Sequence, residues 1–377
     1  MSTASAAPTA SPPSRKRRML KILEWLVLVA VFLVVLNLLG VDIIGWLDNL
    51  WDEIKDIPPG YMIGACIVQF GQTFFAGVSY YGILKYAYTA EVELWPIVAA
   101  YSVGVALNGF LPANLGTFVT LMMFIAIIPS CGFAGALGAY IVQKIFFTII
   151  GTFVYLYMFL SVPGSFDVSF GNVTSHPGLV VGIIVGGILL IYLLVRMFWG
   201  RIKAKLTKAW DQAKDGGAIL SEPRVYLRKS FLPSFISWCC KLGVIAIFLA
   251  AFAIPVTFES VIWVSGSGSL ANMVSFTPGS IGVTQATNAL ALGTCCDVPY
   301  QQAVDYSTAQ QLLMTGWNQV VALVLVVCVF GWTGGKQLVG DSYEDAKVKT
   351  AEMKADRAAK KAEKKAAKQA EKAKQGA

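Results

Sequence analysis

The chain has 377 residues, of which 56% are hydrophobic, 14% charged and 12% aromatic, a balance that excludes the ordinary soluble globular class and indicates a polytopic membrane protein. The net charge of +8 is concentrated in residues 15–18, between Arg196 and Lys229, and after Lys336. The positive-inside rule and attraction to anionic lipid account for this charge, so nucleic acid is not expected as a partner.

The first expected elements are a disordered basic N-terminus and an uncleaved membrane span. Residues 1–19 are rich in Ser, Ala and Pro, a composition that cannot bury a core. Leu20–Leu39 follows four basic residues, is about twenty residues long and has no small-x-small cleavage site after it, which favours a span over a signal peptide. The acidic stretch Asp42–Asp56 then lies outside, where its helical spacing predicts an interfacial helix.

Tyr61–Leu84 returns to the cytoplasm as the next span. Gln69, Gln72 and Thr73 place polar groups on one side of it. For these residues we favour interhelical hydrogen bonds over substrate contact.

Apolar sequence is then interrupted twice by the same pattern. The stretches Phe110–Gly116 and Phe276–Gly282 both read F-x-P-x-x-x-G, and each is preceded by an asparagine, Asn108 or Asn272. Proline removes a backbone donor and glycine weakens a helix, so each copy is expected to break a membrane-embedded helix into two halves. A matched pair of broken helices in the two halves of a membrane protein points to a transport site.

The charge of the flanking loops sets the direction of each segment. The pieces around Pro112 enter from the cytoplasm and return to it, either as a re-entrant hairpin or as two short tilted spans. Spans over Phe133–Leu160 and Phe231–Ile254 run outward, and those over Leu179–Met197 and Leu312–Gly331 run inward. The element around Pro278 therefore starts and finishes outside, so the two breaks enter from opposite faces, as an inverted repeat requires.

These segments predict an all-α polytopic membrane protein with about six full spans plus two broken or re-entrant helix pairs arranged as an inverted repeat. The transmembrane domain covers residues 20–332, with repeat units of about 20–160 and 179–332. It is expected in the plasma membrane, with the N- and C-termini cytoplasmic. Residues 333–377 are rich in Ala, Lys and Glu without a sustained apolar stripe, which predicts a solvated, partly helical cytoplasmic tail.

Two lysines fall deep in apolar spans, and a buried ionisable residue in a membrane suggests function because its desolvation is costly. Lys144 lies twenty-eight residues after Gly116, and Gln310 lies twenty-eight after Gly282, so these positions are expected to be equivalent in the two halves. Lys241 is the second lysine. The alternative is that each lysine snorkels or pairs with a carboxylate such as Glu259 or Asp305.

The second half of each broken helix presents free N–H groups and a positive dipole end, which suit a phosphate or carboxylate. Asn114 or Thr117 and Thr277 or Ser280 are expected to cap these ends. Seven cysteines without C-x-x-C spacing and a single histidine exclude a zinc or His-based mechanism. We therefore expect no catalytic residues, no metal and no cofactor.

At the two breaks the chain resembles the lysylphosphatidylglycerol synthase transmembrane, or flippase-like, family. Members carry an N-x-x-x-P motif running into a glycine in the first half and a P-G-G-x-G motif in the second, matched here by Asn108, Pro112 and Gly116, then Pro278, Gly279 and Gly282. The resemblance covers about residues 20–332 and implies movement of a lipid or lipid-linked headgroup between leaflets.

The resemblance has departures that make the implied site more neutral. Many relatives place an acidic residue and an Arg after the first motif, where this chain has Thr117 and Thr120, and a Glu after the second, where it has Gln285. Some members carry a soluble aminoacyl transferase domain, which this sequence does not show, so lysyl transfer is not implied.

The sequence thus predicts a non-enzymatic translocase for a lipid or lipid-linked, phosphate-headed substrate, with anionic membrane lipids as its partners. The alternative is a membrane scaffold or accessory subunit that recruits a protein partner through its basic tail. The expected substrate-binding residues are Asn108, Pro112, Asn114, Gly116, Thr117, Lys144, Lys241, Asn272, Thr277, Pro278, Gly279, Ser280, Gly282, Gln285 and Gln310.

Overall fold

The computed structural model describes residues 52, 54–55, 57–89, 92–109, 111, 115–161, 217–274 and 277–375, without the side chains at 160, 272–274, 278, 354 and 356–375. The chain divides into two compact units, Met1–Ile57 and Pro58–Ala377, and the helices named below all lie in the second. The expected N-terminal span Leu20–Leu39 and the span Leu179–Met197 lie outside the described residues.

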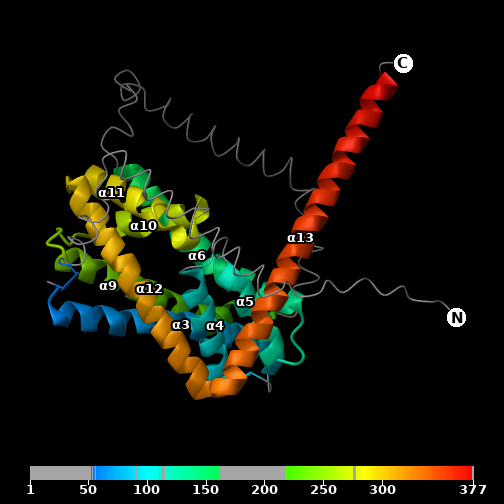
Figure 1. The fold of residues 1–377 in the computed structure, drawn as a ribbon, viewed down its shortest axis with the longest axis horizontal. Coiled ribbons are helices and arrows are strands. Elements are labelled where there is room, and N and C mark those ends of the chain that lie inside the picture. The colour runs from blue at the N-terminus through cyan, green and yellow to red at the C-terminus, as the bar shows by residue number, and fades with distance from the viewer. Residues whose placement is uncertain are drawn as a thin grey trace, which may run out of the picture. The chain divides into compact units, whose positions relative to one another are not determined.

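In chain order, the first half contains one long helix, two short helices and a second long helix (Figure 1). The bounds are α3 (Pro59–Tyr88), α4 (Leu94–Asn108), α5 (Leu115–Ile127) and α6 (Phe133–Ser161). Pro59 occupies the first turn of α3, where a missing N–H costs nothing because that donor has no intrahelical partner. The break between α4 and α5 falls where the first F-x-P-x-x-x-G motif predicted it.

The second half repeats this order. A continuous helical segment of α8 (Pro223–Tyr226), the π-helical η5 (Leu227–Phe231) and α9 (Leu232–Ala251) follows the short 3-10 helix η4 (Ala218–Ser221). Then come α10 (Phe258–Val274), the 3-10 turn η6 (Pro278–Ser280), α11 (Val283–Cys296) and α12 (Tyr300–Phe330). Helix α13 (Trp332–Gln375) ends the described chain.

The π-helical turn before α9 has a local cause. Pro233 has no N–H to donate to the carbonyl four residues earlier, that of Lys229, so the regular ladder is interrupted there. The Lys229 carbonyl abuts Gly82 of α3 so closely that a Cβ at Gly82 would collide with it. A glycine on one helix and a proline on the next thus allow α3 and α9 to pack closely.

Helix packing follows the same scheme in both halves. Helices α3 and α9 pack against each other, α4 packs on α5 and α12, and α10 packs on α11 and α6. One apolar cluster gathers around α3–α6, with Phe124 and Ile97 fully buried, and another around α9–α12, with Leu249 and Leu292 fully buried. The expected inversion of one half relative to the membrane stays a prediction.

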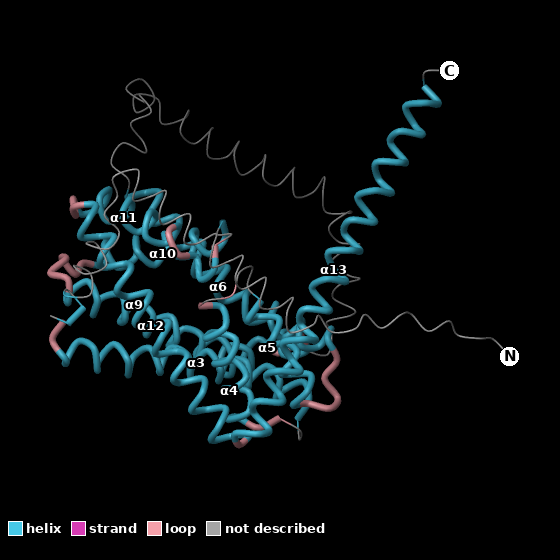
Figure 2. Tube along the Cα trace, in the orientation of Figure 1, coloured by secondary structure: helices cyan, strands magenta, loops and turns pink. Residues whose placement is uncertain are grey.

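Figure 2 shows the described segments as helices joined by short loops, without strands in that part of the chain. Among the described residues, four segments are long and apolar enough to cross a membrane: 59–88, 133–159, 223–251 and 300–353. The shorter α4 and α5 are also apolar. The all-α polytopic membrane class is confirmed, while the number of full spans stays a prediction.

The start of the tail packs against other helices, whereas the sequence predicted a solvated tail because it shows no sustained apolar stripe. Helix α13 turns back from α12 at Gly331, whose φ of 72° is rare for other residues, and packs against α5 and α12 (Figure 1). Gly335, Ser342 and Ala346 are buried and recur at helical spacing. The stripe was missed because two of these three residues are small and one is polar.

Candidate functional site

The two helix breaks meet. Gly279, in the turn between α10 and α11, lies so close to Gly109, at the end of α4, that a Cβ at Gly279 would collide with the Gly109 carbonyl oxygen. A Cβ at Gly109 would in turn lie 2.6 Å from Cγ2 of Thr315 on α12. The absence of a side chain at Gly279 allows the two breaks to touch, and its absence at Gly109 allows α12 to approach the same point. The F-x-P-x-x-x-G pattern and its neighbours thus build one junction from two distant parts of the chain.

The second break is an unusual backbone turn. Gly279, Ser280 and Gly282 have φ angles of 61°, 62° and 85°. Gln285 Oε1 accepts a hydrogen bond from the Gly282 N–H at 2.7 Å, and Gln285 Nε2 donates to Gln311 Oε1 at 2.8 Å. Gln311 Nε2 in turn donates to the Gly279 carbonyl. The two glutamines therefore satisfy backbone groups that the turn leaves without helical partners.

The hydroxyl cap expected for α11 is wrong. Gly282 occupies the capping position, and the Thr277 hydroxyl donates instead to the Ile281 carbonyl at 2.9 Å. Gln285, three residues into the helix, reaches back and accepts from the Gly282 N–H at the start of the helix. Glutamine and glutamate both make this capping contact, so glutamine can replace the glutamate of the family motif here.

A first polar cavity of about 120 Å³ lies among α3–α6, beside the first break. Asn108 Nδ2 donates to Thr117 Oγ1 at 3.1 Å across the break, and its buried Oδ1 has no partner in the described part of the chain. Gly116 allows the approach, since a Cβ there would meet the Asn108 backbone N and Oδ1 at 2.7 Å. The motif residues Asn108, Gly116 and Thr117 are thus brought together, with one acceptor left unsatisfied.

Lys144 lines this first cavity from α6. Its ammonium lies 5.1 Å from the ring centroid of Tyr140 and 5.2 Å from that of Phe147, within the range of cation–π attraction. It forms no ion pair with any carboxylate in the described ranges. Contrary to the expectation of a buried lysine, the side chain is exposed on the surface of the described structure, and its charge is available to an anion.

A second polar cavity of about 250 Å³ lies among α3, α9, α10, α11 and α12, beside the second break. Lys241 lines it from α9, and its Nζ donates to the Ser265 carbonyl at 3.3 Å and to Ser269 Oγ at 3.4 Å. Its charge is not neutralised by a described carboxylate, and Asp305 instead accepts hydrogen bonds from Gln301. Lys241 and Asp305 therefore do not form the ion pair that was the alternative expectation.

Amide groups dominate the rest of the second cavity. Gln69 Nε2 donates to Asn318 Oδ1 at 3.1 Å, and Asn288 Nδ2 donates to Ser307 Oγ at 2.8 Å. Gln69 therefore makes the interhelical hydrogen bond that its position predicts. The amides of Gln72 and Gln310 also line the cavity without a side-chain hydrogen bond in the described part of the chain, so they are available to a ligand.

The expected site residues divide into four groups. Those that line a cavity are Asn108, Thr117, Lys144, Lys241, Gly279 and Gln310. Those that shape a break are Gly116, Thr277, Ser280, Gly282 and Gln285. Pro112 and Asn114 lie outside the described residues, and for Asn272 and Pro278 only the backbone is described. Lys144 and Gln310, at equal distances from their motifs, line corresponding cavities from α6 and α12.

Sequence reasoning missed the contribution of Gln311, Asn318 and Asn288. The signal was present, since Gln311 and Asn318 lie seven residues apart, on one helix face, in a span where amides are costly. In the described ranges no group of three or more His, Cys, Asp or Glu residues gathers in a way that could hold a metal.

No curated protein and no solved structure matches the chain. A protein-family model, described as the lysylphosphatidylglycerol synthase TM region, matches residues 25–322, which include both breaks and all the described residues that line the two cavities. The match extends over more than half of the chain. The matched region contains the paired motifs and the membrane helices described above. The chain therefore belongs to the family of the lysylphosphatidylglycerol synthase TM region, of which residues 25–322 are the membrane domain.

Proposed function

We propose that this protein moves an anionic, phosphate-headed membrane lipid between the two leaflets, with the paired helix breaks forming the path of the headgroup. The observation that carries the proposal is the meeting of the breaks at Gly109 and Gly279, with a polar, lysine-lined cavity beside each break. Lipid cannot satisfy irregular backbone, so polar groups at such breaks are tolerated only beside a cavity or within protein. Broken helices at a repeat interface are where transporters bind their substrates.

The lining of the cavities favours a headgroup with one negative charge and several hydrogen-bonding groups. Lys241 and Lys144 each offer one positive charge, while Gln72 and Gln310 offer amides that both donate and accept. No Asp or Glu is present among the described residues that line either cavity. A phosphate bearing uncharged hydroxyl groups matches this set, and a cationic headgroup lacks a counter-charge there.

In this proposal the protein lies in the plasma membrane with both termini cytoplasmic, because the basic segments flank the proposed inner ends of the spans. The two halves are inverted relative to each other, so that each break is approached from a different leaflet. The protein transports without catalysing a covalent step and needs no cofactor.

Leaflet exchange in vesicles tests the proposal. The full chain is reconstituted with fluorescent phosphatidylglycerol, and the fraction of probe that becomes accessible to a membrane-impermeant quencher is followed over time. We expect Lys241→Met to slow exchange by at least about tenfold, because a hydrogen bond to a charged group contributes roughly 1.5–3 kcal/mol. Lys144→Met is expected to slow it in the same direction. Arg228→Met, on the same helical segment and outside both cavities, is the matched control.

Two results would overturn the proposal. One is wild-type protein that is folded and inserted yet exchanges the probe no faster than empty vesicles. The other is exchange that is unchanged in both lysine variants, which would show that the cavities do not carry the headgroup.

A further inference from the structure

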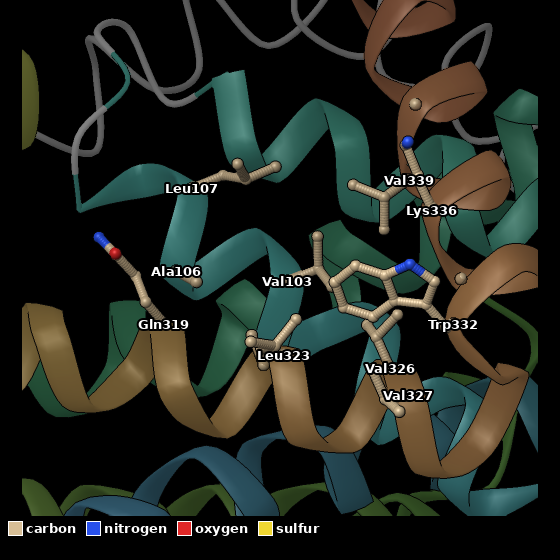
Figure 3. A pocket seen from close by; sticks show the side chains of 13 residues that line it. Val103, Ala106, Leu107, Gln319, Leu323, Val326, Val327, Trp332, Lys336 and Val339 are labelled. Carbon is tan, nitrogen blue, oxygen red and sulfur yellow. The ribbon is translucent and has the colours of Figure 1, made fainter.

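A separate groove of about 530 Å³ lies between α4, α12 and the start of α13, and its volume is typical of a small-ligand site. Figure 3 shows Val103, Val326 and Trp332, one from each helix, lying close together along it. Gly335 keeps α13 close to α12, since a Cβ there would collide with Val326. The groove therefore has a wall that depends on the packed first turns of the tail.

The groove is apolar along its length and polar at its ends. Lys336 is the one charged residue among the described residues that line it, and Gln319 lies on the other side of the apolar side chains (Figure 3). Lys336 is exposed and forms no ion pair with a described carboxylate. Trp332 next to it has the amphipathic ring that favours the membrane–water interface. A long apolar slot with a cation and an indole at one end matches an anionic lipid.

Helix α12 links this groove to the second cavity. Thr315 and Asn318 line the cavity, and Gln319, Ala322 and Val326 line the groove. Thr315, Gln319, Ala322 and Val326 are spaced by four, three and four residues and so lie on one face of the helix. One face of α12 thus changes from hydroxyl and amide side chains to aliphatic ones. The polar cavity and the apolar groove adjoin along this face.

We infer that the groove binds one acyl chain of an anionic membrane lipid, with the lipid phosphate at Lys336 and the chain running toward Gln319. The charge of Lys336 and the apolar walls select this occupant. Binding in the groove does not require that the lipid is moved between leaflets. This inference is therefore independent of the proposed translocation.

Photo-crosslinking tests the inference. The full chain is placed in nanodiscs containing phosphatidylglycerol or phosphatidylcholine with a diazirine in one acyl chain, and labelled peptides are mapped by mass spectrometry. Leu323 lines the groove and is 54% exposed, whereas Val324, next to it, is 52% exposed and does not line it. Leu323→Trp fills the groove, and Val324→Trp is its matched control. Lys336→Gln is compared with Lys347→Gln, farther along α13 and outside the groove.

We expect phosphatidylglycerol to label peptides of α4, α12 and α13, and Leu323→Trp to reduce this to background while Val324→Trp leaves it unchanged. Lys336→Gln is expected to lower the preference for phosphatidylglycerol over phosphatidylcholine by about fivefold, the effect of one lysine near an anionic lipid, and Lys347→Gln to preserve it. Labels that map elsewhere, or equal labelling in the Leu323 and Val324 variants, would overturn the inference. If Leu323→Trp does not fold, the labelled peptides of the wild-type protein and the comparison of Lys336→Gln with Lys347→Gln still test whether the groove binds the lipid.

Discussion

The two lysines of the candidate site occupy different surroundings, and each leaves a charge available to a ligand. Lys241 donates to a carbonyl and a hydroxyl oxygen, and Lys144 lies beside two aromatic rings. Neither arrangement supplies a negative charge, and an ammonium group in a low-dielectric cavity is costly without one. An anionic ligand would supply it, which is why these residues rather than the hydroxyls are expected to dominate affinity.

The glycines at the junction of the breaks offer a sharp test at the same scale. Gly279→Ala introduces a Cβ at a φ of 61° and a collision with the Gly109 carbonyl, whereas Gly282→Ala has a φ of 85° and open space. The left-handed backbone alone costs roughly 1–2 kcal/mol. We therefore expect Gly279→Ala to lower the thermal unfolding midpoint in detergent more than Gly282→Ala does. Equal shifts would mean that strain, and not contact between the breaks, sets the need for glycine.

At the scale of elements, the short helices are held by close backbone contact and the tail by a stripe of small residues. Gly104 on α4 approaches α5 so closely that a Cβ there would collide with the Thr120 hydroxyl, which donates to the Gly116 carbonyl at 3.1 Å. Small residues allow such approach in membranes, where no hydrophobic force drives helices together. Gly335 in the first turn of α13 uses the same device against α12, and α13 also packs on α5.

The packing of α13 predicts unequal effects of two neighbouring substitutions. Ala346 is 0% exposed and belongs to the core around α3–α6, while Val348 is 58% exposed. Ala346→Glu buries an uncompensated charge and is expected to destabilise the protein by roughly 3–5 kcal/mol. Val348→Glu is expected to be nearly neutral. Thermal unfolding of the purified full chain compares them, and a stable Ala346→Glu protein would show that the tail does not pack in solution.

At the scale of the whole molecule, two halves with the same order of helices meet at their breaks and enclose separate polar cavities. In each half, the second helix after the break, α6 or α12, contributes a residue at the same distance from the motif glycine, Lys144 or Gln310. The halves therefore share a design, although the matched position is a lysine in the first half and a glutamine in the second. A headgroup that passes between them would meet amides together with one lysine on each side.

The charge of the residues that line the two cavities predicts the selectivity of the molecule. Since no described carboxylate lines either cavity, excess phosphatidylglycerol or phosphatidylinositol is expected to slow the exchange of the fluorescent probe by competition. Lysylphosphatidylglycerol, with its added positive charge, is expected to compete several-fold less well. The measurement is the exchange rate at a fixed fraction of competitor lipid. Stronger competition by the cationic lipid would contradict the proposed headgroup class.

Several features could be predicted from the sequence because they depend on local rules. Apolar runs with few charges indicate membrane helices, and a proline with a glycine four residues later interrupts them, so the break between α4 and α5 and that between α10 and α11 were located correctly. The equal spacing of Lys144 and Gln310 from their motif glycines likewise placed them on corresponding helices.

Only the tertiary structure decided which of these groups meet. The contact of Gly109 with Gly279, the hydrogen bond from Gln311 to the Gly279 carbonyl and the packing of Ala346 join residues far apart in the chain. Such contacts depend on how whole helices pack, which no short-range pattern specifies. The sequence by itself thus determined the membrane class, the breaks and the two lysines within apolar helices, and the packing of the helices determined that the breaks form one junction beside two cavities.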